Sequence, residues 1–189
     1  KTKSLKNFFK NFENYNYKDW KEIMSVNLDG AFLLSKAISK IMINQKSGNI
    51  ISIASIQGVV GNDKRLYKGS KISGIQMGSP AVYSASKSAL ISFAESLYFD
   101  MIRKNVKVSV ICPGFIKTPM TDQNDFPMPM IKSAEYAADK IYFGLLKKDS
   151  FEIHFPKTFT FMMKIIKILP NWLYFGSINF GNKFLKRDQ

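Results

Sequence analysis

The feature that most constrains the fold is an alternation of short apolar runs with longer segments of helical periodicity. Residues 50–54 and 106–111 are rich in β-branched side chains and are apolar on both faces, as buried parallel strands are. In the segments around them, apolar residues recur at steps of three and four, which indicates helices. Strands that alternate with helices predict an α/β fold with a parallel sheet flanked by helices. The predicted helices are 20–47, 82–103 and 133–148, and a third strand is predicted at 151–155.

Particular residues set the expected ends of these elements. Asp19 and Ser133 are expected N-caps, because a short side-chain oxygen can accept from a free N–H of the first helical turn. Ser47-Gly48 is expected to end the first helix, since glycine adopts the left-handed conformation without strain. Pro113-Gly114 is expected to end the second strand. Residues 56–81 are rich in Gly, Ser and Lys and are predicted to form a long loop.

Composition narrows the class of protein. With 46% hydrophobic and 22% charged residues among 189, the chain has the balance of a globular domain and is long enough to bury a core. Its single cysteine, Cys112, excludes an intramolecular disulfide. Because the chain has one cysteine and one histidine, His154, we expect no metal site. We expect Cys112 to be buried and inert, and His154 to be a packed or surface residue.

The chain is strongly basic, with 28 Lys and Arg against 14 Asp and Glu and a net charge of +14. Such a charge can attract nucleic acid, a membrane surface or a phosphorylated substrate. The lysines are scattered, so a solvated lysine-rich surface is the alternative, and without a recognised motif we expect no nucleic-acid partner. The chain starts at Lys1 without an apolar leader, and no stretch reaches the roughly 18 apolar residues of a membrane-spanning helix. The expected location is therefore the cytoplasm.

The strongest chemical indication is the run Tyr83-Ser84-Ala85-Ser86-Lys87. Tyr83 and Lys87 are four residues apart on a predicted helix, so they share one face of it. An ammonium beside a phenol favours the phenolate, and we expect Lys87 to lower the pKa of Tyr83 from its ordinary value near 10. A tyrosine tuned in this way can exchange a proton with an alcohol or a carbonyl. Taken alone, the pattern also fits a surface pair without a role.

Five segments in order resemble the short-chain dehydrogenase/reductase family, over about residues 20–155. They are Asn27-Leu28-Asp29-Gly30, Gly48 to Ser55, Tyr83 to Lys87, Val108 to Gly114, and Phe115 to Met120. The resemblance implies the C-terminal part of a doubly wound Rossmann-type sheet. It also implies an NAD- or NADP-dependent oxidoreductase that interconverts a secondary alcohol and a ketone. The choice between NAD and NADP and the identity of the substrate are left open.

The resemblance implies a role for each matched residue. Tyr83 would be the general acid and base, Lys87 would lower its pKa and bind the nicotinamide ribose, and Ser55 would hold the substrate oxygen. Asn27 would help to hold a water that relays protons to Lys87. The implied catalytic residues are Asn27, Ser55, Tyr83 and Lys87, and the implied cofactor-binding residues are Asn27, Tyr83, Lys87, Pro113, Gly114, Ile116 and Thr118.

The chain departs from the family pattern in two ways. The glycine-rich phosphate-binding turn and the family's NNAG segment would lie upstream of Lys1, so this segment alone is expected to bind cofactor poorly. The gap between Ser55 and Tyr83 is longer than the family's usual gap, and it contains a second Tyr-x-x-x-Lys pattern at Tyr67 and Lys71. We prefer Tyr83, because a good helical sequence follows Lys87. The stretch 57–67 also resembles an insertion in short-chain reductases of surface-sugar and flagellin-modification pathways.

The C-terminal part, 156–189, is predicted to be a basic amphipathic tail appended to an incomplete Rossmann-type domain at 1–155. Large apolar side chains and interleaved lysines in 157–175 predict a helix that Pro170 ends or kinks. This helix would lie on an anionic membrane, cover the substrate entrance or pack against another subunit of a homo-oligomer. The rival class of function is a non-enzymatic, degenerate member of the family used for binding.

Overall fold

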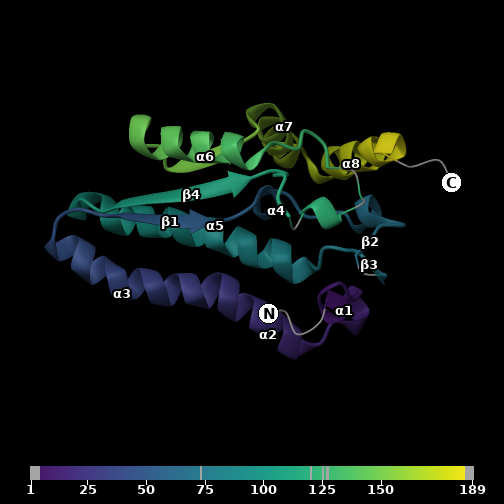
Figure 1. Ribbon diagram of the computed structural model, residues 1–189, viewed down its shortest axis with the longest axis horizontal. Coiled ribbons are helices and arrows are strands. Elements are labelled where there is room, and N and C mark those ends of the chain that lie inside the picture. The colour runs from purple at the N-terminus through teal and green to yellow at the C-terminus, as the bar shows by residue number, and fades with distance from the viewer. Residues whose placement is uncertain (1–4, 73, 120, 125, 127, 186–189) are drawn as a thin grey trace.

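The computed structural model describes residues 5–72, 74–119, 121–124, 126 and 128–185. Its centre is a parallel sheet of β1 (Asn49–Ile53), β4 (Lys107–Pro113) and β5 (Glu152–Phe155), in the order β1-β4-β5 (Figure 1). Ile53 pairs with Ile111, and Ile111 pairs with Ile153. The predicted α/β fold with a parallel sheet is confirmed. Residues 186–189 of the predicted tail lie outside the described residues.

Helices cover the sheet on both sides (Figure 1). On one side lie α3 (Gly30–Asn44) and α5 (Ala81–Met101), and on the other lies α6 (Ala134–Tyr142). α7 (Lys157–Ile168) packs against β5 and α4. Successive strand side chains point to opposite faces, and β4 contributes to two cores. The prediction that 50–54 is buried on both faces is wrong, because Ile51 and Ile53 of β1 are 42% and 52% exposed. One core joins Val110 and Cys112 to Leu90 and Ala94 of α5. The second joins alternate strand residues to α6 and contains Ile111, Ala137, Ile153 and Phe155.

The first helical region begins and ends three residues earlier than predicted and is interrupted. It consists of α2 (Tyr17–Met24), a π-helical turn over Ser25–Asp29, and α3. The predicted end at Ser47-Gly48 is wrong: the helix ends at Asn44, and Lys46 adopts the left-handed conformation after it, with a φ of 53°. The predicted N-cap, Asp19, is wrong: the cap is Asn16, whose Oδ1 accepts from the Asp19 N–H at 2.9 Å. Both residue types can cap a helix, so the sequence offers two possible starts three residues apart, and the helix begins at the earlier one.

The prediction of a long loop over 56–81 is also wrong in detail. The segment contains α4 (Ile56–Val59), a 3-10 turn over Lys64–Tyr67, and a small antiparallel hairpin of β2 (Lys71–Ile72) and β3 (Ile75–Gln76). Such short elements have too few residues to show a periodicity in sequence. We refer to 56–81 as the insertion.

The remaining elements are the helices near the C-terminus and several short helical turns. Ser133 caps α6 as predicted, and Pro170 separates α7 from α8 (Asn171–Leu185). None of the helices in the part of the chain that the structure describes is long and apolar enough to cross a membrane. The short elements are α1 (Leu5–Phe8) and the helical turns Phe12–Asn14, Ile102–Lys104, Thr121–Gln123 and Phe143–Lys147.

Candidate active site

Tyr83 and Lys87 lie on the first two turns of α5, at the end of the molecule to which β1 and β4 point (Figure 1). The Lys87 Nζ is 5.8 Å from the centre of the Tyr83 ring. The two side chains therefore share one helix face, as their spacing predicts. The alternative pair is not arranged in this way, because Tyr67 ends a 3-10 turn and Lys71 begins β2.

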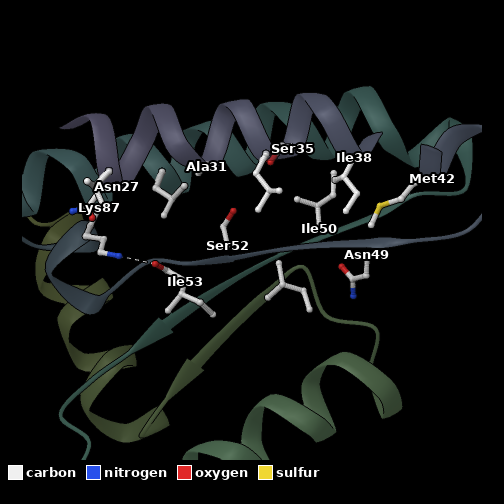
Figure 2. Close-up of a pocket in the computed structure, with 14 residues that line it drawn as sticks. Asn27, Ala31, Ser35, Ile38, Met42, Asn49, Ile50, Ser52, Ile53 and Lys87 are labelled. Atoms are coloured by element: carbon white, nitrogen blue, oxygen red, sulfur yellow. Dashed lines mark hydrogen bonds between the residues drawn. The ribbon is translucent and has the colours of Figure 1, made fainter. Parts of the chain in front are cut away.

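The Lys87 ammonium donates to the Ile53 carbonyl at 2.7 Å, at the carboxyl end of β1 (Figure 2). Since the next N–H, that of Ala54, donates to Ile111 of β4, the Ile53 carbonyl points away from β4. Lys87 thus lies at the edge of β1 that faces away from β4. A cavity of about 340 Å³ follows this edge between β1 and α3. Figure 2 shows side chains from α3 above Ser52 and Ile50 of β1.

Ser55 connects β1 to the insertion. It is the N-cap of α4, and its Oγ accepts from the Gln57 N–H at 3.2 Å. Short polar residues cap helices because their side-chain oxygen satisfies one of the free N–H groups of the first turn. Ser55 is also hydrogen-bonded to the Tyr83 side chain. The tertiary structure therefore brings together two residues that the insertion separates in sequence.

The electrostatics of Tyr83 differ from the expectation. Burial raises the pKa of Tyr83 above its ordinary value of 10.0, and the hydrogen bond with Ser55 opposes this only in part. The expected lowering by Lys87 is absent from this structure, because the ammonium is directed to the Ile53 carbonyl. Burial also lowers the pKa of Lys87 from 10.5. Both groups therefore favour their neutral forms more than the same groups in water.

Asn27 lies in the π-helical turn between α2 and α3 and lines the cavity beside β1. Its Nδ2 donates to the Ser86 Oγ at 3.0 Å, and Ser86 in turn donates to the Tyr83 carbonyl at 2.9 Å. π-helical turns are frequent at functional sites, where they redirect one side chain. Asn27 is thereby fixed against the same turn of α5 that carries Tyr83.

The other matched residues follow β4. Pro113 ends the strand, and the Gly114 N–H donates to the Phe155 carbonyl at 2.8 Å. A Cβ at Gly114 would lie 3.2 Å from that carbonyl oxygen, so the position has little room for a side chain. Ile116 forms a bridge with Lys132. The Thr118 N–H donates to the Thr121 Oγ1 at 2.7 Å, which holds the loop after β4 in a compact turn.

The insertion brings a second tyrosine to this end of the sheet. The ring of Tyr67 is buried and lies 4.6 Å from that of Phe126. Its hydroxyl accepts from Gln57 Nε2 and Asn62 Nδ2, both at 3.1 Å, and the Gln57 Oε1 accepts from Ser79 Oγ at 3.2 Å. Tyr83 raises the pKa of Tyr67 electrostatically, in addition to the larger effect of burial. The sequence analysis missed Gln57, Asn62 and Ser79, since isolated amides and hydroxyls in a loop have no pattern.

Cys112 and His154 lie deeper in the molecule. Cys112 is fully buried, and burial raises the pKa of its thiol to about 12, so it is unreactive at neutral pH. His154 lies on β5, and its Nδ1 is 2.6 Å from the Thr160 Oγ1 of α7. It is partly buried between β5 and α7.

Comparisons with known proteins show which family the chain resembles. A family model described as short chain dehydrogenase matches residues 7–127. An uncharacterised oxidoreductase from Myxococcus xanthus is 31% identical over 152 residues, which are 80% of this chain and 54% of that protein. A 3-oxoacyl-(acyl-carrier-protein) reductase from Escherichia coli is 36% identical over 103 residues, which are 54% of this chain and 36% of that protein. The chain thus spans about half of the first relative and about a third of the second.

Solved structures share the fold. A short chain dehydrogenase from Burkholderia cenocepacia, solved in complex with NADP, matches with a TM-score of 0.63 and 23% identity. The match covers 84% of this chain and 60% of that one. A 4-hydroxyisoleucine dehydrogenase complexed with NADH matches with a TM-score of 0.58 and 21% identity, over 80% of this chain and 64% of that one. At these identities the likeness concerns the fold.

Proposed function

This chain belongs to the short-chain dehydrogenase family, and on that premise we propose that it carries the proton-transfer site of an NAD- or NADP-dependent oxidoreductase. The proposed reaction interconverts a secondary alcohol and a ketone. The observation that carries the proposal is the meeting of Ser55, Tyr83 and Lys87 at the carboxyl ends of β1 and β4. In open α/β sheets ligands bind at this end of the strands.

Each residue of the site has a distinct task in the proposed reaction. The Ser55 hydroxyl donates to the substrate oxygen and stabilises the negative charge that develops on it. The Tyr83 hydroxyl gives its proton to that oxygen during reduction and takes it back during oxidation. Lys87 supports the charge left on Tyr83 once its ammonium turns from the Ile53 carbonyl toward the phenol. Asn27 fixes the first turn of α5 through Ser86.

The residues around the β1 cavity fit the nicotinamide end of a dinucleotide. The Lys87 ammonium and the Asn27 amide both line this cavity and supply polar donors beside the strand ends. When bound, NAD or NADP supplies or accepts the hydride. The phosphate groups would need residues beyond those gathered here, since the chain's own sequence holds no glycine-rich turn that follows a strand. The residues proposed to hold the nicotinamide end are Asn27, Tyr83, Lys87, Pro113, Gly114, Ile116 and Thr118, of which Asn27 and Lys87 line this cavity.

Matched tyrosine variants test the proposal. Tyr83→Phe should abolish NADPH- or NADH-dependent reduction of ketones and 3-oxoacyl thioesters by the full-length protein, because it removes the proton donor. Tyr136→Phe, in a partly buried tyrosine of α6, is the control and should keep full turnover. If Tyr83→Phe kept its activity and Tyr67→Phe lost it, the proton donor would be Tyr67 and the proposed role of Tyr83 would be wrong. Absence of any cofactor binding by the wild-type protein would favour the non-enzymatic alternative.

The exposed apolar face of α7 and α8 supports a second proposal, contact with an anionic membrane. Ile168, Trp172 and Phe175 are 82%, 74% and 60% exposed, although side chains of this size are usually covered. Lys157 and Lys167 are exposed on the same two-helix unit. A helix with exposed aromatic residues and interleaved lysines fits the interface of an anionic bilayer, where each lysine contributes roughly 1 kcal/mol.

Co-sedimentation with vesicles tests this contact. The full-length protein should pellet with vesicles that contain phosphatidylglycerol and should stay in the supernatant with pure phosphatidylcholine. The double variant Trp172→Ser/Phe175→Ser should lose the binding. Phe99→Ser is the control, since Phe99 is 75% exposed on α5, in the opposite helical layer. If the wild-type protein stays in the supernatant at low salt, these helices instead cover the substrate entrance or a subunit interface.

A further inference from the structure

A cleft of about 440 Å³ lies between the N-terminal segment and the insertion. One wall carries Phe9 and Asn11, and the other carries residues of the 3-10 turn at 64–67 and of β3. The walls are in close proximity, because a Cβ at Gly78 would lie 3.8 Å from the Phe9 carbonyl oxygen. Segments far apart in the sequence thus form one cleft, at the same end of the molecule as β2 and β3 (Figure 1).

The cleft is basic. Lys64, Arg65 and Lys68 line it, and no acidic residue does. The charge of Arg65 is offset by Asp63, whose Oδ2 is 2.6 Å from its Nη2. In the described part of the chain, no carboxylate lies within ion-pair distance of Lys64 or Lys68. Two lysine charges therefore stay uncompensated inside one cleft.

The lining of the cleft is also partly apolar. Met77 is buried and Phe9 is half-buried, and both belong to a cluster with Tyr67 and Phe126. A ligand that fits has an anionic part for the lysines and an apolar part for Phe9 and Met77. The uncompensated charges match a phosphate better than a single carboxylate, because a phosphate ester carries up to two negative charges, and lysine is a frequent phosphate ligand.

The cleft is adjacent to the candidate active site through Tyr67. Tyr67 lies in the same turn as Lys64 and Arg65, and its hydroxyl accepts from Gln57, which follows Ser55 closely in α4. Gln57 also accepts at its Oε1 from the Ser79 Oγ at 3.2 Å, and Ser79 lies just before α5, the helix that carries Tyr83. A molecule that extends from the lysines across the Tyr67 cluster would bring its far end toward Tyr83.

We propose that this cleft binds the phosphate-bearing arm of the substrate. The proposal rests on the proposed function and specifies its substrate class: a ketone or secondary alcohol joined through an apolar linker to a phosphate ester or diphosphate. Two sources share this chemistry, a phosphopantetheine arm and a nucleoside diphosphate.

Isothermal titration of the full-length protein without nicotinamide cofactor tests the cleft independently of turnover. The probes are pantetheine 4′-phosphate and uridine diphosphate, each at low and at high ionic strength. One of them should bind at low salt and more weakly at high salt, because the lysines are exposed. The probe that binds identifies the source of the phosphate.

Charge-matched variants assign the binding to the cleft. Lys64→Ala/Lys68→Ala should raise the dissociation constant at least about tenfold, since two charge-assisted contacts are lost. Lys40→Ala/Lys104→Ala removes the same charge from exposed positions elsewhere and should leave it unchanged. Equal effects of the two variants, or no binding of either probe to the wild-type protein, would overturn the proposal.

Steady-state kinetics with two ketones distinguish a failure of the anion site from a failure of the proposed reaction. With a phosphate-bearing ketone, Lys64→Ala/Lys68→Ala should raise KM and leave kcat unchanged. With a neutral ketone of the same reacting end, it should change neither constant. If the wild-type protein turns over neither ketone but the titrations behave as expected, the proposed reaction fails and the anion site stands. An equal change in KM for both ketones would overturn the anion site and leave the reaction intact.

Discussion

Gly58 offers the sharpest test of how the insertion is joined to the active site. It lies in α4, where a Cβ would be 2.8 Å from the carbonyl carbon and oxygen of Lys87 and 2.9 Å from the Ile91 Cδ1. The Ser88 Oγ also donates to the Gly58 carbonyl at 2.6 Å. Two of the contacted atoms belong to the backbone of α5, so Gly58→Ala can be accommodated only if α4 moves away from α5.

The magnitude follows from two opposing effects. Overpacking a well-packed contact costs about 1–3 kcal/mol, and a backbone neighbour favours the upper end of that range. Replacing glycine by alanine regains about 0.4–1 kcal/mol by restricting the unfolded chain. We expect a net loss of about 2 kcal/mol in the free energy of unfolding, from these two ranges together. For a chain of this length, that loss lowers Tm by about 4–8 °C.

Gly61→Ala is the matched control. A Cβ at Gly61 meets nothing within 4 Å, so only the effect on the unfolded chain remains. Its free energy of unfolding should rise by about 0.4–1 kcal/mol. Thermal and urea unfolding, followed by circular dichroism, measure both variants. Because Ser55 begins α4, Gly58→Ala should also reduce turnover at the temperature where both variants are folded. A Tm for Gly58→Ala equal to or above that of Gly61→Ala would refute the close contact of α4 and α5.

Three further predictions concern titration and ion pairing. The pKa of Tyr83 is raised by burial, so a spectrophotometric titration without cofactor should give its phenolate a midpoint above pH 10.0, as a component that Tyr83→Phe removes. The pKa of His154 is lowered from 6.5, chiefly by burial, so the unfolded chain binds the proton more readily. Stability should therefore fall as the pH drops through 6.5, and urea unfolding of His154→Gln should lose that part of the pH dependence. The half-buried pair of Lys164 and Glu152, 2.5 Å apart, predicts a loss of about 1–2 kcal/mol in Lys164→Met, between the values for exposed and buried pairs. The exposed Lys107 pair should cost less than about 1 kcal/mol in Lys107→Met, and equal losses in these two variants would contradict the burial of the first pair.

Local patterns determined the elements of the sheet and its helices. The runs at 50–54 and 106–111 predict β1 and β4 because β-branched residues favour strands, although only β4 is buried on both faces. The cap at Ser133 and the break at Pro170 were predictable because each depends on one residue and its nearest neighbours. The placement of Tyr83 and Lys87 on one helix face follows from the helical repeat alone.

The tertiary structure decided how these groups meet. The insertion separates Ser55 from Tyr83 in the sequence, and the packing of α4 on α5 brings them together. The raised pKa of Tyr83 depends on burial, and the position of the Lys87 ammonium depends on a carbonyl at the end of β1. Neither quantity is encoded in the spacing of the two residues.

The insertion and the basic cleft also depend on tertiary packing that sequence patterns do not reveal. The sequence of 56–81 predicts a loop, but its buried Tyr67 and Met77 find partners in Phe126 and in the N-terminal segment. The lysines that line the cleft are indistinguishable by sequence from the scattered lysines elsewhere. Desolvation and charge proximity are properties of segments that fold against one another. Periodicity reports only what a residue and its near neighbours along the chain can do, so the sequence determined the elements, and long-range packing determined the site.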